Sequence, residues 1–150
     1  MSLTADTILL ANAPLFGSLA QDELRLIAFG ARKRPFRAGD VLFHEGRAAD
    51  GAAVVEAGRI RLENAAGDHR IAERFALLDE FALVGRRPHV HTMTAETDGS
   101  LMLIDRTLFR RMLEEFPDIA KKTRDRLAVR LERLAVEAEE ALRRLERAGV

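Results

Sequence analysis

Glycines divide the middle of this sequence into short apolar stretches, and this feature constrains the fold more than any other. The stretches between Ala31 and Ile104 include Asp40–His44, Ala52–Val55, Arg59–Leu62 and Ser100–Ile104, and the glycines around them are Gly39, Gly46, Gly51, Gly58, Gly67, Gly85 and Gly99. In one stretch, apolar Ile60 and Leu62 alternate with arginines, which is the pattern of a strand with one buried face. Short strands separated by turns predict an antiparallel β-sandwich or roll.

Helical periodicity precedes the predicted strands. From Leu3 to Phe29 the spacing of apolar residues predicts two short helices. Ser18, with Gln21 three residues later, indicates a capping box at the start of the second helix. Gly30 suits a left-handed stop at its end.

Two further helices are predicted after the strands. Asp105 can cap a helix that runs through Glu115, and Pro117 then suits the first turn of a second helix that meets no Pro or Gly before Gly149. We therefore expect a mainly β jelly roll with flanking helices over residues 1–116. A long dimerisation helix of the same domain occupies residues 117–148.

The long helix carries a narrow apolar seam. Its members alternate steps of four and three residues: Leu127, Leu131, Leu134, Ala138, Ala141, Leu145 and Ala148. This register is typical of a coiled coil, whereas a stripe packed on the chain's own roll would be wider. The seam predicts a homodimer, and its three alanines indicate a moderately tight one. Packing of the stripe on the roll is the alternative.

Composition excludes several classes of function. Lys plus Arg and Asp plus Glu number 24 each, so no overall charge favours nucleic acid or an acidic membrane. The absence of cysteine excludes disulfides, thiolate metal sites and a cysteine nucleophile. The sequence shows no membrane span, export signal or catalytic motif. We expect a cytoplasmic protein that is not an enzyme and has neither a catalytic nor a metal site.

Several segments together resemble the cyclic-nucleotide-binding domain of the catabolite-activator/Fnr regulator family. Leu15-Phe16 is similar to the family's opening helix, Phe36–Gly46 to its first strand pair, Val54–Leu62 to the next hairpin and Ala95–Asp105 to its closing strands. The resemblance extends from about Leu15 to Leu145. It implies a double-stranded β-helix, or jelly roll, with a ligand pocket.

The resemblance also implies a phosphate-binding cassette, which is degenerate here. In the family a Gly-Glu pair opens a short helix that cradles the cyclic phosphate, Glu binds the ribose, and an Arg-Ser or Arg-Thr pair holds the phosphate. Here Glu80 is retained, but Asp79 replaces the glycine and His89-Val90 replaces the Arg-Ser pair. Leu134-Ala135 replaces the hydroxyl pair that the family's archetype offers to adenine. The candidate ligand site comprises Asp79, Glu80, Phe81, Ala82, His89, Val90 and His91.

Two features near the cassette leave alternatives open. Arg86 and Arg87 fit a solvated loop, although a small register shift would bring Arg87 to the site. His89 and His91 alternate on one strand face and are expected to point into the roll with Met93. There they would be polar residues in a small wet cavity, or ligands of a metal or haem.

These observations predict a dimeric regulatory sensor module without a DNA-binding domain, since the chain ends at Gly149-Val150 without a helix-turn-helix. We expect no tight cyclic AMP or cyclic GMP and no DNA as a partner of this chain alone. The partner classes left open are a different small molecule and a protein, and no cofactor is identified. The alternatives are a structural interaction module with a side-chain-filled pocket, or the sensor half of a truncated transcription regulator.

Overall fold

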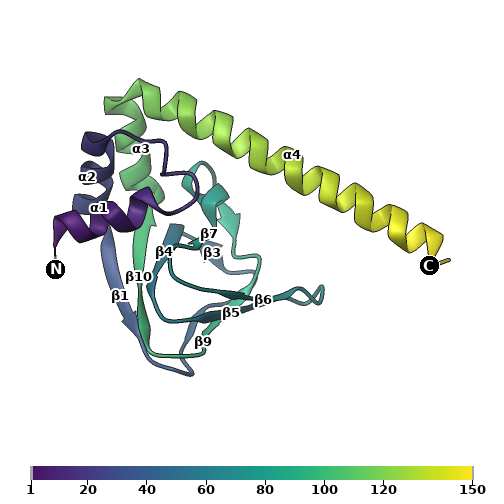
Figure 1. The fold of residues 1–150 in the computed structure, drawn as a ribbon. Coiled ribbons are helices and arrows are strands. Elements are labelled where there is room, and N and C mark those ends of the chain that lie inside the picture. Colours follow the sequence, from purple (N-terminus) through teal and green to yellow (C-terminus); the bar gives the residue numbers. More distant parts are fainter. Residues whose placement is uncertain (1, 150) are drawn as a thin grey trace.

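The computed structural model describes residues 2–149, in which short strands lie between helices at both ends of the chain (Figure 1). The strands are β1 (Arg32–Phe36), β2 (Val41–Phe43), β3 (Ala48–Ala49), β4 (Gly51–Ala57), β5 (Ile60–Glu63), β6 (His69–Ala72), β7 (Leu77–Leu78), β8 (Arg87–Pro88), β9 (Thr92–Ala95) and β10 (Gly99–Asp105). The helices are α1 (Leu3–Ala11), α2 (Gln21–Gly30), a short 3-10 helix η1 (Glu80–Leu83), α3 (Arg106–Glu115) and α4 (Pro117–Arg147).

The strands form two antiparallel four-stranded sheets, which confirms the predicted jelly roll. One sheet has the order β1-β10-β4-β7 and the other β2-β9-β5-β6, while β3 pairs with β8. The alternation predicted for β5 is observed, because Ile60 and Leu62 are buried and Arg61 is partly exposed. Gly58, at the turn between β4 and β5, has a φ of +89°, and a Cβ there would meet the carbonyl oxygen of Asp98. This turn therefore requires glycine.

The first sheet separates two hydrophobic clusters. On β4, Ala53 and Val55 point into the roll, whereas Ala52 and Val54 point toward the helices. Successive residues of a strand face opposite sides of its sheet, so a strand with both faces covered is apolar throughout. This explains why Ala52–Val55 has no polar residue.

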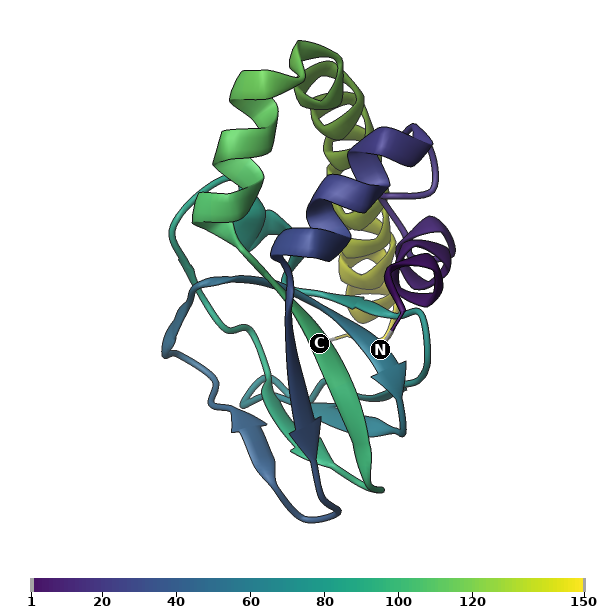
Figure 2. The ribbon, with the colours of Figure 1, turned by 90° about the vertical axis from the view of Figure 1, so that its left-hand side faces the viewer.

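The helices α1, α2 and α3 gather at one end of the roll, over β1 and β10 (Figure 2). The start of α2 differs from the prediction. Glu23, not Gln21, accepts the end-capping hydrogen bond, from the backbone N–H of Ala20 at 2.7 Å. The buried hydroxyl of Ser18 has no hydrogen-bond partner among the described residues. The predicted Ser18–Gln21 capping box is therefore wrong.

Gly30 also has a different role from the one predicted. It belongs to α2 and its φ is not positive, so it is not a left-handed stop. A Cβ at this position would lie 2.5 Å from Cδ1 of Leu108 in α3. Any larger residue at this position would therefore displace the Leu108 side chain where the two helices approach each other.

The long helix α4 starts at Pro117, as predicted, and then leaves the helical end as a rod that passes beside the roll (Figure 1). Its first turns pack into the chain's own core through Ile119, Thr123 and Leu127. Leu127, predicted at the dimer seam, is only 8% exposed and belongs to this core. The exposed part of the seam therefore begins at Leu131. No helix among residues 2–149 is both long and apolar enough to cross a membrane.

Candidate functional site

The predicted cassette is the short helix η1 and the chain on either side of it. Arg106, the first residue of α3, holds this segment in place. Its Nη1 donates to the carbonyl oxygens of Ala49 at 3.2 Å, Ala82 at 3.0 Å and Gly85 at 3.3 Å. One guanidinium therefore ties the cassette to β3 and to the helical end of the molecule.

Asp79 adopts a left-handed conformation at the start of the cassette, with a φ of +59°. This backbone region favours glycine, which is the residue expected here from the family resemblance. The sequence replaces the glycine but keeps its conformation. Asp79 thereby adds a carboxylate at the position where the family resemblance implies a glycine beside a phosphate.

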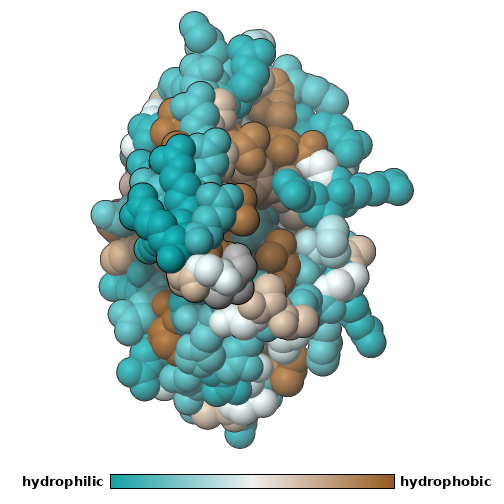
Figure 3. All heavy atoms as spheres, turned by 90° about the vertical axis from the view of Figure 1, so that its right-hand side faces the viewer, coloured by the Kyte–Doolittle hydropathy of each residue, from teal (hydrophilic) through white to brown (hydrophobic). Residues whose placement is uncertain are grey.

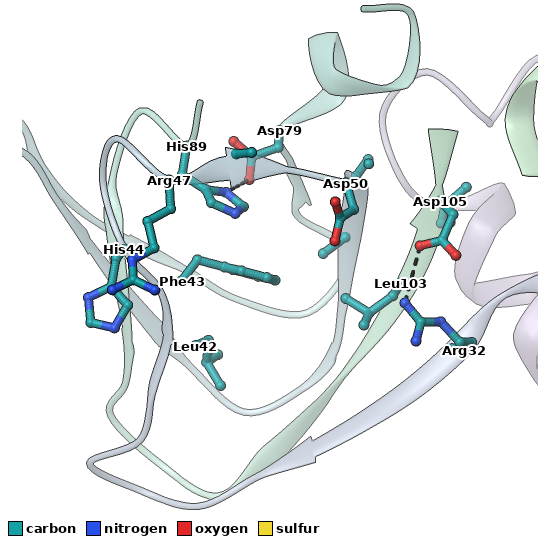
Figure 4. Close-up of a pocket in the computed structure, with 15 residues that line it drawn as sticks. Arg32, Leu42, Phe43, His44, Arg47, Asp50, Asp79, His89, Leu103 and Asp105 are labelled. Atoms are coloured by element: carbon teal, nitrogen blue, oxygen red, sulfur yellow. Dashed lines mark hydrogen bonds and ion pairs between the residues drawn. The ribbon is translucent and has the colours of Figure 1, made fainter. Parts of the chain in front are cut away.

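The Asp79 carboxylate turns toward His89, which does not face the cassette helix (Figure 4). Oδ2 of Asp79 lies 2.7 Å from Nδ1 of His89, and the His89 ring stacks on Phe43 with 4.5 Å between the ring centroids. Burial raises the pKa of the Asp79 carboxyl, because it disfavours the ionised form, and the hydrogen bond with His89 opposes this effect. His89 is thus committed to a buried pair within the roll.

A cavity of about 280 Å³ lies on this side of the cassette (Figure 4). Its polar lining includes His44, Arg47, Asp50, Asp79, His89 and Asp105. Arg32, which also lines it, forms an ion pair with Asp105 at 3.2 Å. The cavity therefore has a polar wall over an apolar floor formed by Phe43 and Leu103.

Glu80, the retained cassette residue, is paired with the long helix. Its Oε1 accepts hydrogen bonds from Arg130 of α4, at 2.9 Å from Nε and 2.5 Å from Nη2. The Glu80 side chain is only 13% exposed. The family resemblance implies that the Glu80 carboxylate binds a ribose, but here Arg130 already binds this carboxylate. The ion pair also connects the cassette to α4.

His91 is buried as predicted, but it does not share a site with His89. Its Nε2 lies 2.7 Å from Oδ2 of Asp68, and this hydrogen bond lowers the pKa of the Asp68 carboxyl. Each histidine therefore has its own carboxylate partner. Among residues 2–149, no group of three or more His, Cys, Asp or Glu side chains is arranged to hold a metal ion.

A larger pocket, of about 470 Å³, lies between the cassette and α4. Figure 3 looks from the side on which α4 ends and shows hydrophobic residues around a hollow beside the helix. The pocket is lined by Asp68, Arg70, Asp79, Glu80, Phe81, Ala82, Arg87, Pro88, Val90, His91, Arg130, Leu131, Arg133, Leu134 and Glu137. We call it the cassette pocket.

The cassette pocket brings together every predicted ligand-site residue except His89. Arg87, for which a solvated loop and a place at the site were both left open, is exposed and also lines the pocket. Sequence reasoning missed Arg130, although its position four residues before Leu134 places it one helical turn from a predicted contact. Asp68 was missed too, because nothing local marks the tip of a hairpin as the partner of a distant histidine.

This fold and pocket define a jelly-roll ligand-binding domain of the regulatory type. The sequence matches the family model of the cyclic nucleotide-binding domain over residues 33–116, so the chain belongs to that family. The predicted resemblance to the catabolite-activator/Fnr regulators is thus confirmed.

Three similar proteins are two regulators of known sequence and one cyclic nucleotide-binding-like protein of known structure. The cAMP-dependent protein kinase type II regulatory subunit of Drosophila melanogaster is 29% identical over 68% of this chain and 27% of its own. The HTH-type transcriptional regulator Cmr of Mycobacterium tuberculosis is 29% identical over 75% of this chain and 48% of its own. The chain thus spans less than half of these curated relatives. A cyclic nucleotide-binding-like protein from Brucella abortus is 36% identical over 73% of this chain and 97% of its own, with a TM-score of 0.64.

Proposed function

We propose that this chain is a dimeric regulatory sensor module of the cytoplasm, that it is not an enzyme, and that it does not bind cyclic AMP or cyclic GMP in the family's usual way. One observation supports this most directly. Both carboxylates at the start of the cassette have partners within the chain: Asp79 pairs with His89 and Glu80 pairs with Arg130.

Each of these two pairs disfavours the binding of a cyclic nucleotide for a different reason. The Asp79 carboxylate stands at the helix start where a phosphate would approach, and Glu80 would have to give up Arg130 before it could bind a ribose hydroxyl. His89 in place of arginine also removes a charge-assisted hydrogen bond of about 1.5–3 kcal/mol. The rest of the pocket is formed, so the proposal is a sensor with a different ligand.

The dimer is proposed to form through the exposed part of the α4 seam. Leu131, Leu134 and Leu145 are 59%, 51% and 49% exposed, and Ala138 and Ala141 are exposed between them. Leu131 and Leu134 also line the cassette pocket. Pocket contents and helix pairing therefore share two side chains, and a ligand that moves them would change dimer affinity by reciprocal linkage.

A structural interaction module without a ligand is the competing function. It would require a pocket filled by the chain's own side chains. The cassette pocket, with a volume of about 470 Å³, is instead large enough for a small organic molecule and favours the sensor.

Restoring the family's residues tests the proposal. The triple variant Asp79→Gly, His89→Arg and Val90→Ser should bind cyclic AMP more than tenfold tighter than the unmodified chain, which requires only about 1.4 kcal/mol. Glycine suits the φ of +59° at position 79, so the variant should fold. Calorimetry measures both affinities.

A matched control introduces an arginine and a serine at two positions outside the cassette pocket. His69 and Ile71 are exposed on β6 and do not line the cassette pocket, so His69→Arg with Ile71→Ser should not alter binding. The proposal fails if the folded triple variant binds no better than the unmodified chain, or if the control gains as much.

A further inference from the structure

The charges around the cassette pocket are unevenly paired. Of its four carboxylates, Asp68 pairs with His91, Asp79 with His89 and Glu80 with Arg130. Across residues 2–149, no ion pair joins Arg87, Arg133 or Glu137 to another side chain, whereas Arg70 pairs with Asp68 and Arg130 with Glu80. Two guanidinium groups at the pocket are therefore available to an anionic group of a ligand.

Arg87 is placed to meet such a group beside an apolar surface. Its guanidinium carbon lies 5.4 Å from the centroid of the Phe81 ring, so the cation is held over an aromatic face on the pocket wall. This contact leaves the N–H groups at the edge of the guanidinium free to donate to an acid. Arg133 lines the same pocket from α4.

Apart from His91 and its charged residues, which include Arg70, the wall is non-polar. It is made by Phe81, Ala82, Pro88, Val90, Leu131 and Leu134, and no side chain with a hydroxyl or an amide lines the pocket in the described part of the chain. Over this part of the wall, a hydrogen-bonding base edge would lose its water contacts without gaining side-chain partners. A hydrocarbon or unsubstituted aromatic body would be buried favourably.

We propose that the cassette pocket binds an amphipathic organic anion, with one acidic head group held by Arg87 and Arg133 and a non-polar body against the apolar wall. This inference rests on the proposed sensor function and names the ligand class of the same pocket. The acid replaces water at the two arginines, while the body covers Leu131 and Leu134, which also belong to the dimer seam.

Two fluorescent probes test the two halves of the ligand. 8-Anilinonaphthalene-1-sulfonate carries an acidic group on an aromatic body, and N-phenyl-1-naphthylamine has nearly the same body without the acid. The chain has neither Trp nor Tyr, so directly excited probe emission is measured without protein emission near it. The sulfonate should bind one equivalent per chain and more tightly than the amine.

Variants test whether the two arginines cause the difference in affinity between the sulfonate and the amine. Arg87→Gln and Arg133→Gln should each weaken sulfonate binding by at least about fivefold and change amine binding by less than about twofold. Arg74→Gln is the matched control, because Arg74 is also an exposed arginine over a phenylalanine ring, at 4.7 Å from Phe75, but does not line the cassette pocket. It should change neither affinity.

The ligand class is overturned if both glutamine variants bind the sulfonate as the unmodified chain does, if the amine weakens in parallel, or if Arg74→Gln has the same effect. Competition with cyclic AMP separates this result from a failure of the sensor proposal. Displacement of the sulfonate by micromolar cyclic AMP would contradict the proposed function even where both arginines prove necessary. No displacement together with dependence on Arg87 and Arg133 supports both.

Discussion

Replacing two leucines of the α4 seam by aspartate should convert a dimer into monomers. Complete burial of a leucine contributes about 1.5–3 kcal/mol. Leu131, Leu134 and Leu145 are already about half covered, at 59%, 51% and 49% exposure, so about 1 kcal/mol remains for each. The six leucines of two chains then supply about 6 kcal/mol before the entropic cost of association, so this seam alone gives a dissociation constant no smaller than roughly 10–100 μM.

Sedimentation equilibrium from about 5 to about 500 μM protein covers this range. The double variant Leu131→Asp with Leu134→Asp buries charges at the seam, and each costs several kcal/mol, so no dimer should form at the highest concentration. Val129→Asp with Val136→Asp is the control. Both valines are 54% exposed, and the 3.6-residue period puts them on the face of α4 opposite the seam.

The seam is refuted as the dimer interface if its double variant still dimerises. It is equally refuted if the valine control weakens the dimer to the same extent, because charge anywhere on α4 would then explain the effect.

Three further predictions concern the cassette, its pH dependence and nucleic acid. Arg106→Met removes the hydrogen bonds to three carbonyls and should lower the free energy of unfolding in urea by about 2–4 kcal/mol; an unchanged value would refute the role of Arg106. Burial raises the pKa of Asp79 above its ordinary value of 3.8, so its stabilising contribution is full below that pH and is lost as pH rises through the native pKa. Asp79→Asn should therefore gain stability relative to the unmodified chain as the pH rises above about 4, and a constant difference would contradict this. Because formal charge is balanced, a mobility-shift titration at physiological salt should show no sequence-dependent submicromolar binding of duplex DNA.

Much of the fold follows from local patterns in the sequence. Glycines with positive φ, such as Gly58, mark turns, and alternation along β5 identifies its buried face. Pro117 marks the start of α4. These signals act within a few residues, so a single sequence displays them.

The misassigned features depend on competition or on tertiary contacts. Ser18 has a suitable capping side chain, but Glu23 caps the start of α2 instead. Gly30 is a residue type that often ends a helix, yet here it lies against the Leu108 side chain of another helix. Neither outcome is encoded in the residues next to the position.

The sequence was sufficient to predict which residues form the candidate site. It was not sufficient to predict which of their side chains pair with one another. The cassette residues could be located from Glu80 and its neighbours. The pairing of Glu80 with Arg130 joins positions 50 residues apart, and His89 pairs with Asp79 at the other end of the cassette segment. Electrostatic partners that meet only in the folded chain leave no local trace.

Calorimetric titration of the unmodified chain with cyclic AMP tests the central claim most directly. The internal pairs of Asp79 and Glu80 predict no binding tighter than about 100 μM at neutral pH. A dissociation constant of about 1 μM or below, with every cassette residue unchanged, would show that a cyclic nucleotide displaces these pairs readily and would contradict the account.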